Sequence, residues 1–496
     1  MRRDLIKILS LSLLALHSLC RISGAQELIQ APAAIHISST ISDGKYSISE
    51  IVRIAKQNNI KIVVITDRDL MCWEYGLWPL RNMIKKTVES NSIFKYGISR
   101  YLKKIEAAQK ANPDLILIAG IESAPFYYWQ GIPFGDNFTL KDWHKHILVI
   151  GLERAEDYKN LPIVGNRRGL ALPFRPKNIF YLFWPVLILA AGFLCFRKRQ
   201  FNYQDLHGNR LGPYSRAWRI LGIFLIIAGL VSLMNNYPFC EVKFDQYQAK
   251  AGIAPYQNFI NYVRQRGGLT FWAHPEAAYI ETRGRVKIET PEHSLDLLRA
   301  CDYTGFAVFF EGYEKIGHPG GIWDETLKEY CRGQRKSPVW AIAGLSFDAS
   351  GNLSEYMQDV RTVCLIPEFN KREVLKALGE GRAYVMRGAR SSRFILDKFV
   401  IKDTSSGMEK TMGEEITLKQ KPQLKISGHF LGGTNLPCKI KLIKNGAILE
   451  TFETNSPFEI TYQDESDENQ AKIYYRVEIE FKDSLLVTNP IFVKFI

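Results

Sequence analysis

The chain has 496 residues, 46% of them hydrophobic, and a formal net charge of +14. Its length exceeds that of a typical single domain, so we expect two or more domains with sizeable hydrophobic cores. Lysine and arginine are scattered among acidic residues, and no RNP, KH or helix-turn-helix pattern is present, so a solvated charged surface is favoured over a nucleic-acid-binding protein.

The first 25 residues are predicted to be a signal peptide. The basic start MRRDLIK precedes the apolar run ILSLSLLALHSLC, and Gly24 and Ala25 offer a small-residue cleavage site. The run is short for a membrane span, so export with cleavage is favoured over an uncleaved anchor. Export permits disulfides, but the eight cysteines include no C-x-x-C pair and their spacing identifies no bridge, so thiolate zinc sites are not expected.

The stretch from Ile35 to Asp69 predicts a strand, a loop, a helix and a second strand. The amphipathic helix is expected at about residues 49–58 and the buried second strand at 60–66. Polar side chains follow both strands, and α/β folds place their chemistry at the carboxyl ends of strands. These polar residues are His36, Ser38, Asp43, Asp67 and Arg68. Asp43 belongs to a Ser-Asp-Gly turn, where aspartate is also common for structural reasons.

Four more polar residues flank predicted buried strands. Glu122 ends LILIAGIE, His146 precedes ILVIGL, His274 follows a strand in FWAHPE, and Asp348 follows AIAGLSF. Imidazole and carboxylate groups are common ligands of transition-metal ions, so these residues are candidates for a metal site. A strand-end turn explains Asp348 nearly as well.

Two transmembrane helices are predicted at about residues 179–196 and 218–234. Eighteen helical residues span roughly 27 Å, close to the thickness of the hydrocarbon core of a bilayer. The loop between the helices is rich in lysine and arginine and contains one acidic residue, Asp205, which is typical of a cytoplasmic loop. With the signal peptide, this places the flanking globular segments on the extracytoplasmic side; buried core helices are the alternative.

From about residue 396 the hydrophobic pattern changes to period two. Stretches such as KPQLKISGHF and IYYRVEIEF alternate with turns, one of which contains Asn445 and Gly446. This pattern predicts a small antiparallel β-sandwich that serves for binding or packing.

Taken together, these motifs resemble the PHP (polymerase and histidinol phosphatase) family of metal-dependent hydrolases, in its CehA/McbA-like branch. The similarity lies in H-x-S and S-D-G around residues 36–44, T-D-R at 66–68, G-x-E ending at Glu122, G-G-x-x-x-x-A-H-P containing His274, and D-x-S beginning at Asp348. Three residues depart from the family by standing where it has histidine: Ser38, Arg68 and Ser350.

The resemblance implies a distorted (β/α)7-type barrel built from two parts of the chain. Residues 31–151 and 251–395 would form the barrel, and residues 152–250, with the two membrane helices, would be an insertion between two of its strands. The β-sandwich would follow at 396–496.

The resemblance also implies one or two divalent ions of zinc, manganese or iron. The implied ligands are His36, Glu122, His146, His274 and Asp348, with Asp43 as a further candidate. Asp67 would orient its neighbours. A guanidinium 4 Å from a dication is repelled by on the order of 8 kcal/mol at an effective dielectric constant of 20, so Arg68 and a metal ion are not expected to share one position. Arg68 would instead bind an anionic substrate, or pair with Asp67 or Asp69 in an inactive site.

Two functions follow as hypotheses. One is a membrane-tethered, extracytoplasmic hydrolase of phosphoester bonds with a reduced metal site. The other is a catalytically inactive PHP protein that binds a ligand or acts as a scaffold. In both, the lipid bilayer is an expected partner; a small anionic substrate belongs to the first.

Overall fold

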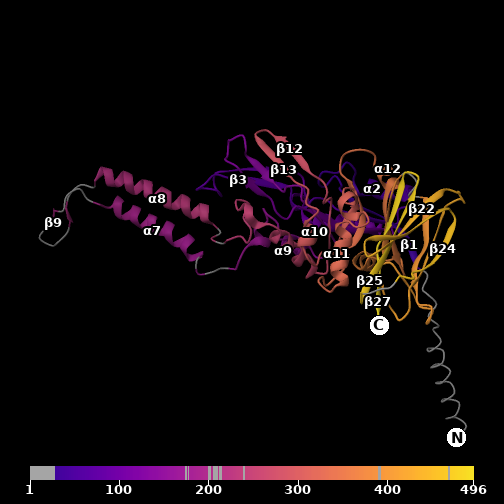
Figure 1. Cartoon of the computed structure of the whole chain (residues 1–496). Coiled ribbons are helices and arrows are strands. Elements are labelled where there is room, and N and C mark those ends of the chain that lie inside the picture. The colour runs from indigo at the N-terminus through magenta and orange to yellow at the C-terminus, as the bar shows by residue number, and fades with distance from the viewer. Residues whose placement is uncertain are drawn as a thin grey trace, which may run out of the picture.

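The computed structural model describes residues 28–173, 176, 178–198, 203–204, 210–211, 215–237, 239, 241–388, 393–466 and 470–496. The predicted signal peptide, residues 1–25, and Asp205 of the predicted cytoplasmic loop lie outside these residues. Figure 1 shows an elongated molecule with two long helices at one end and a β-rich part at the other.

Seven strands close into a barrel in the order β1-β2-β5-β8-β11-β14-β15, with β15 pairing back onto β1. The prediction of a mixed α/β chain with a closed, barrel-like sheet is confirmed. The strands are β1 (Ile29–Ile37), β2 (Ile62–Ile65), β5 (Ile116–Ser123), β8 (Ile147–Ile150), β11 (Leu269–Trp272), β14 (Gly305–Phe309) and β15 (Trp340–Phe347).

The strand β8 runs antiparallel to both neighbours, whereas all other adjacent pairs in the barrel are parallel. This reversal departs from the uniform alternation of a (β/α)7 barrel. Its consequence is that the start of β8 lies at the same end of the barrel as the carboxyl ends of the other six strands.

Helices pack around the barrel, and α2 (Ile48–Gln57) shows why they form where they do. Ser47 accepts from the backbone N–H of Glu50, while Glu50 accepts from the backbone N–H of Ser47, which makes a capping box. The apolar face of α2 is buried in the hydrophobic core. The other longer helices of this part are α4 (Ile98–Lys110), α9 (Ala254–Arg264), α11 (Ile322–Cys331) and α13 (Lys371–Glu380).

The barrel sheet continues into the C-terminal part of the chain without a break. The first half of β1 pairs with β16 (Val360–Ile366), and the sheet then runs through β17 (Ala383–Arg387), β26 (Ser484–Thr488), β25 (Lys472–Phe481), β22 (Pro437–Lys444) and β23 (Ala447–Asn455). A second sheet, β19-β18-β21-β24, spans residues Glu409–Thr411, Phe394–Lys402, Gln423–Phe430 and Phe458–Gln463 and shares a hydrophobic core with the first. The parallel pair β20 (Glu415–Leu418) and β27 (Ile491–Phe495) departs from the antiparallel sandwich expected.

A buried ionic cluster ties α11 to β25. Arg476 donates to Asp324 through Nε at 2.9 Å and Nη2 at 2.7 Å, and to Glu478 through Nη1 at 2.8 Å. All three side chains are 0% exposed. Tyr474 and Tyr313 donate to the two carboxylates at 2.8 and 3.0 Å, so the charges are both paired and hydrogen-bonded.

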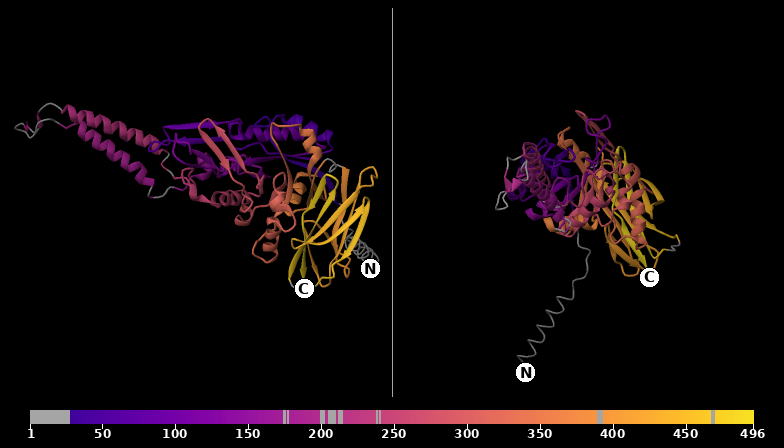
Figure 2. Two further views of the ribbon diagram at one scale, coloured as in Figure 1. Left: turned by 45° about the horizontal axis from the view of Figure 1, so that its top comes forward. Right: turned by 90° about the vertical axis from the view of Figure 1, so that its left-hand side faces the viewer.

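Between β8 and β11 in the chain, α7 (Asn178–Phe196) and α8 (Arg216–Asn236) form a hairpin that projects from the barrel (Figure 2). A Cβ atom on Gly222 would lie 2.6 Å from the Phe196 backbone nitrogen, so glycine permits the close packing of the two helices. Both helices are long and apolar enough to cross a membrane, with mean hydropathies of 2.3 and 2.1.

Candidate metal centre

The predicted site residues converge at one end of the barrel, although they come from strands far apart in the sequence. His36 lies in β1, Arg68 follows β2, Glu122 lies in β5, His146 directly precedes β8 and His274 follows β11. His146 reaches this end because β8 is reversed. An isolated parallel bridge between Arg68 and Glu122 extends the pairing of β2 with β5 into the site.

Glu122 lies at the centre of the group and is 2% exposed. Its Oε2 is 3.1 Å from His36 Nε2, and its Oε1 is 2.7 Å from His146 Nδ1 and 3.5 Å from His274 Nε2. The nitrogens His146 Nδ1 and His274 Nε2 are 3.1 Å apart. One carboxylate is thus surrounded by three imidazoles.

The donor set of Glu122, His146 and His274 fits a metal ion. Their ligand atoms all lie within 4.8 Å of one another. Ligands at about 2.0–2.1 Å in a tetrahedral zinc site are roughly 3.3 Å apart, close to the separations found here. His36 adds a third imidazole nitrogen, 3.1 Å from the other carboxylate oxygen of Glu122.

A backbone irregularity in β1 places His36. The residue has a φ of 71°, and the pairing of β1 with β2 and β15 shifts register between Ile35 and Ile37. Opposite it, a Cβ atom on Gly344 would lie 3.2 Å from His36 Nδ1, so glycine makes room for the ring. Sequence reasoning missed this contribution of Gly344; its only signal was a glycine within the apolar strand before Asp348.

Arg68 is held inside the site by two carboxylates. Its Nε donates to Asp43 Oδ2 at 2.8 Å, and its Nη1 lies 3.0 Å from Glu122 Oε1. The same Nη1 is 3.0 Å from both ring nitrogens of His146. The structure therefore pairs Arg68 with Asp43 and Glu122, and not with Asp67 or Asp69 as one of the expectations had it. Asp43, which was expected as a possible metal ligand, instead accepts a hydrogen bond from the Arg68 guanidinium.

Asp67 supports the loop that carries Asp43. It accepts hydrogen bonds from the Ser39 backbone N–H, the Ser39 hydroxyl and the Ser42 hydroxyl, each at 2.7 Å. Burial raises the pKa of Asp67 above its ordinary value, although these three donors oppose the shift. The Asp67 side chain thus bonds to these two serines, while its backbone carbonyl accepts from the Glu122 N–H at 3.2 Å.

The electrostatics of the site favour an ionised carboxylate and a neutral imidazole. Burial alone would raise the pKa of Glu122, but Arg68, His146 and His36 outweigh burial and hold that pKa well below its usual range. Burial lowers the pKa of His146 to about 4, against the opposing charge of Glu122. A neutral imidazole is the form that binds metal ions, so His146 is ready to act as a ligand at neutral pH.

Asp348 lies at the same barrel end, after β15, but is not part of the group around Glu122. Its Oδ1 accepts from the Ser350 backbone N–H at 3.1 Å, which is the strand-end turn considered from the sequence. It is near enough to add to the negative field on Arg68. Ser38 donates its backbone N–H to the Phe347 carbonyl at 2.9 Å and stands beside Asp43.

No protein-family model matches the sequence, and no curated protein matches it. Among solved structures, the chain is similar to a two-domain protein from Bacteroides vulgatus that contains a predicted PHP-like metal-dependent phosphoesterase, with a TM-score of 0.34, 11% identity, and coverage of 92% of this chain and 91% of that one. It is also similar to an amidohydrolase from Chromobacterium violaceum with bound sulfate and no metal, with a TM-score of 0.26, 14% identity, and coverage of 65% and 89%. At these identities and TM-scores the likenesses assign no ligand and no function, so the chemistry rests on the residues of the site.

Proposed function

We propose that the chain is a PHP-like metal-dependent hydrolase of phosphoester bonds with a reduced metal site. The observation that carries this proposal is the convergence of Glu122, His146 and His274, whose ligand atoms lie within 4.8 Å of one another at the mouth of the barrel. Three residues from three strands would hold one cation, with His36 as the further donor on Glu122.

Arg68 would position the substrate. Its Nε and Nη1 are engaged by Asp43 and Glu122, whereas Nη2 forms no hydrogen bond with any residue that the structure describes. A guanidinium that is held by two carboxylates and retains one free donor is suited to a phosphoryl oxygen. The bound cation, zinc, manganese or iron, would lower the pKa of a water ligand and polarise the phosphoryl group.

We further propose that α7 and α8 tether this hydrolase to a membrane and that the barrel and the C-terminal strands lie on the extracytoplasmic side. The length and apolar surface of both helices support the tether. The basic loop between the helices and the leader-like N-terminus support the orientation.

The purified full-length protein should contain about one equivalent of zinc, manganese or iron and should cleave members of a panel of phosphomonoesters and phosphodiesters. Changing His274→Ala removes one of three ligands and should abolish both metal retention and activity. Metal content by plasma mass spectrometry and phosphate release are the two measurements.

His429→Ala is the matched control, because His429 lies in β21, away from the site, and pairs with Asp397 at 2.8 Å. It should keep both metal and activity. A parent protein without zinc, manganese or iron after mild purification would contradict the proposal.

A second candidate function, a metal-free anion-binding module, is favoured by one specific observation. Arg68 Nη1 already contacts Glu122 and His146, so a guanidinium provides positive charge where a metal would. In such a module the barrel would bind an anionic ligand without hydrolysing it.

Arg68→Gln separates the two candidates. In a hydrolase, removing a cation that repels a dication by on the order of 8 kcal/mol at close range should tighten metal binding at least about a hundredfold while raising KM for an anionic substrate. Zinc titration against a competing chelator measures the first effect and steady-state kinetics the second. In a metal-free module, phosphate binding by the parent in the presence of chelator should instead be lost in the variant.

A further inference from the structure

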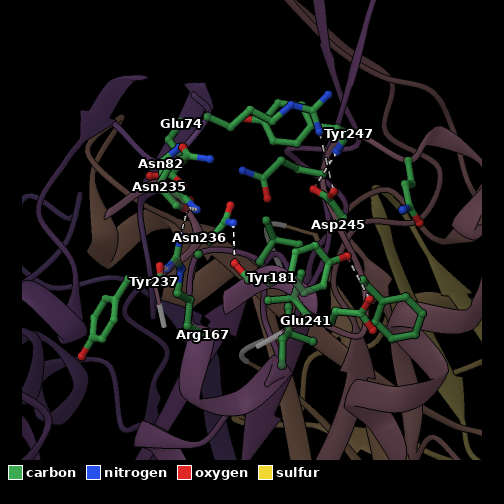
Figure 3. A pocket seen from close by; sticks show the side chains of 18 of the residues that line it. Glu74, Asn82, Arg167, Tyr181, Asn235, Asn236, Tyr237, Glu241, Asp245 and Tyr247 are labelled. Carbon is green, nitrogen blue, oxygen red and sulfur yellow. Dashed lines mark hydrogen bonds and ion pairs between the residues drawn. The ribbon is translucent and has the colours of Figure 1, made fainter. Parts of the chain in front are cut away.

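A cavity of about 540 Å³ lies where the hairpin of α7 and α8 joins the barrel. Figure 3 shows its labelled side chains arranged around a central space, with Asn82, Asn235 and Arg167 along one side and Asp245 and Tyr247 opposite. The cavity is separate from the metal centre, since none of its lining residues is a candidate ligand. The cavity lies next to the ends of the apolar helices α7 and α8, and this position determines which ligands can enter it.

Two guanidiniums line this cavity, and neither is fully satisfied by protein carboxylates. Arg81 lies 3.9 Å from the Tyr247 ring and 3.9 Å from Asp245 Oδ2, while its Nε is buried without a hydrogen-bond partner. Arg167 donates to Asn82 Oδ1 and to the Tyr237 carbonyl at 3.4 Å, and has no carboxylate partner among the described residues. A buried donor without an acceptor, as at Arg81 Nε, is costly, and Arg167 is an exposed guanidinium, so this cavity favours a ligand with anionic oxygens.

The carboxylates of the cavity favour a ligand that also carries a positive charge. Asp245, Glu74 and Glu241 line the same space as the two guanidiniums. Glu74 is paired with Lys85 at 2.5 Å, and Glu241 accepts from the Tyr181 hydroxyl at 3.2 Å. Because Glu74 is neutralised by Lys85, the relevant carboxylate is that of Asp245, which lies 3.9 Å from Arg81. A zwitterionic group can place its amine near this carboxylate while its phosphate contacts the guanidiniums.

The loop between β3 (Cys72–Gly76) and β4 (Lys85–Glu89) places the cavity at the level of lipid headgroups. Trp78 in this loop is 80% exposed and Ile84 is 52% exposed. The loop is fixed to the end of α8, because the Asn82 backbone N–H donates to Asn235 Oδ1 at 3.0 Å and Asn82 Nδ2 donates to the Asn235 carbonyl at 2.6 Å. An exposed tryptophan next to the end of a membrane helix is typical of the membrane–water interface.

We propose that this cavity binds the headgroup of a zwitterionic phospholipid, whose phosphate oxygens accept hydrogen bonds from Arg81 and Arg167 and whose amine faces Asp245. The inference rests on the membrane placement of α7 and α8 and is independent of the metal chemistry. The bound lipid would lie against the hairpin, because Asn235 and Asn236 of α8 line the same cavity as Arg81 and Arg167.

The test uses the full-length protein in detergent and native mass spectrometry with dioctanoyl phosphatidylethanolamine. Removing one charge-assisted contact, by Arg81→Gln or Arg167→Gln, should weaken binding about tenfold. Arg168→Gln is the matched control, since Arg168 neighbours Arg167, is exposed, and does not line the cavity. Dioctanoylglycerol lacks the phosphate. Its affinity for the parent should be no higher than the affinity of the phospholipid for the Arg167→Gln variant.

Three outcomes would overturn the proposal. Equal binding by the parent, Arg81→Gln and Arg167→Gln would remove the cavity from the interaction. Phosphorylethanolamine that binds as tightly as the lipid would assign the cavity to a soluble phosphate compound. Carbonate extraction of membranes containing the protein checks the premise, because release into the soluble fraction would contradict the membrane tether and leave the metal-centre experiments unaffected.

Discussion

Replacing Glu122 by glutamine is expected to lower kcat/KM for phosphoester hydrolysis about a thousandfold, equivalent to about 4 kcal/mol of transition-state stabilisation. Glutamine keeps the shape of the side chain but removes the negative charge that His36, Arg68, His146 and His274 all surround. Metal retention should fall with activity, because a neutral amide is a much weaker ligand for zinc or manganese than a carboxylate.

The control for Glu122→Gln is Glu314→Gln, which makes the same chemical change at an exposed residue outside the site. It should leave kcat/KM and metal content unchanged. Circular dichroism and thermal unfolding show whether the Glu122 variant is folded. We expect it to fold, because Arg68 keeps Asp43 as a partner. A folded Glu122→Gln protein with activity within tenfold of the parent would exclude Glu122 from the chemistry.

Arg476→Leu is expected to destabilise the protein by about 3–5 kcal/mol, the range measured when one partner of a buried ion pair is removed. The variant leaves Asp324 and Glu478 buried without their cation. The apparent Tm at a fixed scan rate measures the loss. Lys328→Leu removes the partner of Glu325 in a solvent-accessible pair on the same helix, in which the two side chains are 25% and 47% exposed, and should cost less than about 1 kcal/mol.

The pH dependence of this variant distinguishes loss of charge pairing from loss of packing. In the parent, burial disfavours the charged form of Asp324, but Arg476 outweighs burial and lowers its pKa, so this stabilisation is present above the ordinary pKa and is lost as the pH falls through the lowered value. Without Arg476, burial raises the pKa of Asp324, and protonation of this carboxyl group relieves part of the cost. The deficit should therefore be largest at about pH 7.5 and shrink towards pH 5; a constant deficit would indicate packing alone.

The residues that converge at the site could be chosen from the sequence, whereas the strand direction that brings them together could not. Glu122, His146 and His274 could be chosen because each adjoins an apolar strand, and strand ends gather at one end of a barrel. The direction of β8 could not be read from ILVIGL, because a short, fully buried run has no polarity along the chain. Yet that direction brings His146 to Glu122.

Two other features also depended on three-dimensional context. The pairing of Arg68 with Asp43 requires the Ser-Asp-Gly turn to fold back over the end of β2, where Ser39 and Ser42 bond to Asp67. Nothing in the spacing of these residues ranks Asp43 above Asp67 or Asp69 as a partner. Likewise, the two sheets of the C-terminal part were expected from period-two patterning, whereas the use of β16 and β17 in one of them was not.

The continuity of the sheet from β1 to β23 has a consequence for how the chain can be divided. A fragment that stopped after residue 395 would keep the barrel strands but would leave β17 as an unpaired edge, because its neighbour β26 comes from residues Ser484–Thr488. Exposed edge strands invite association with other chains. The same fragment would uncover Asp324, which is 0% exposed. The barrel and the C-terminal strands are therefore expected to fold as one unit.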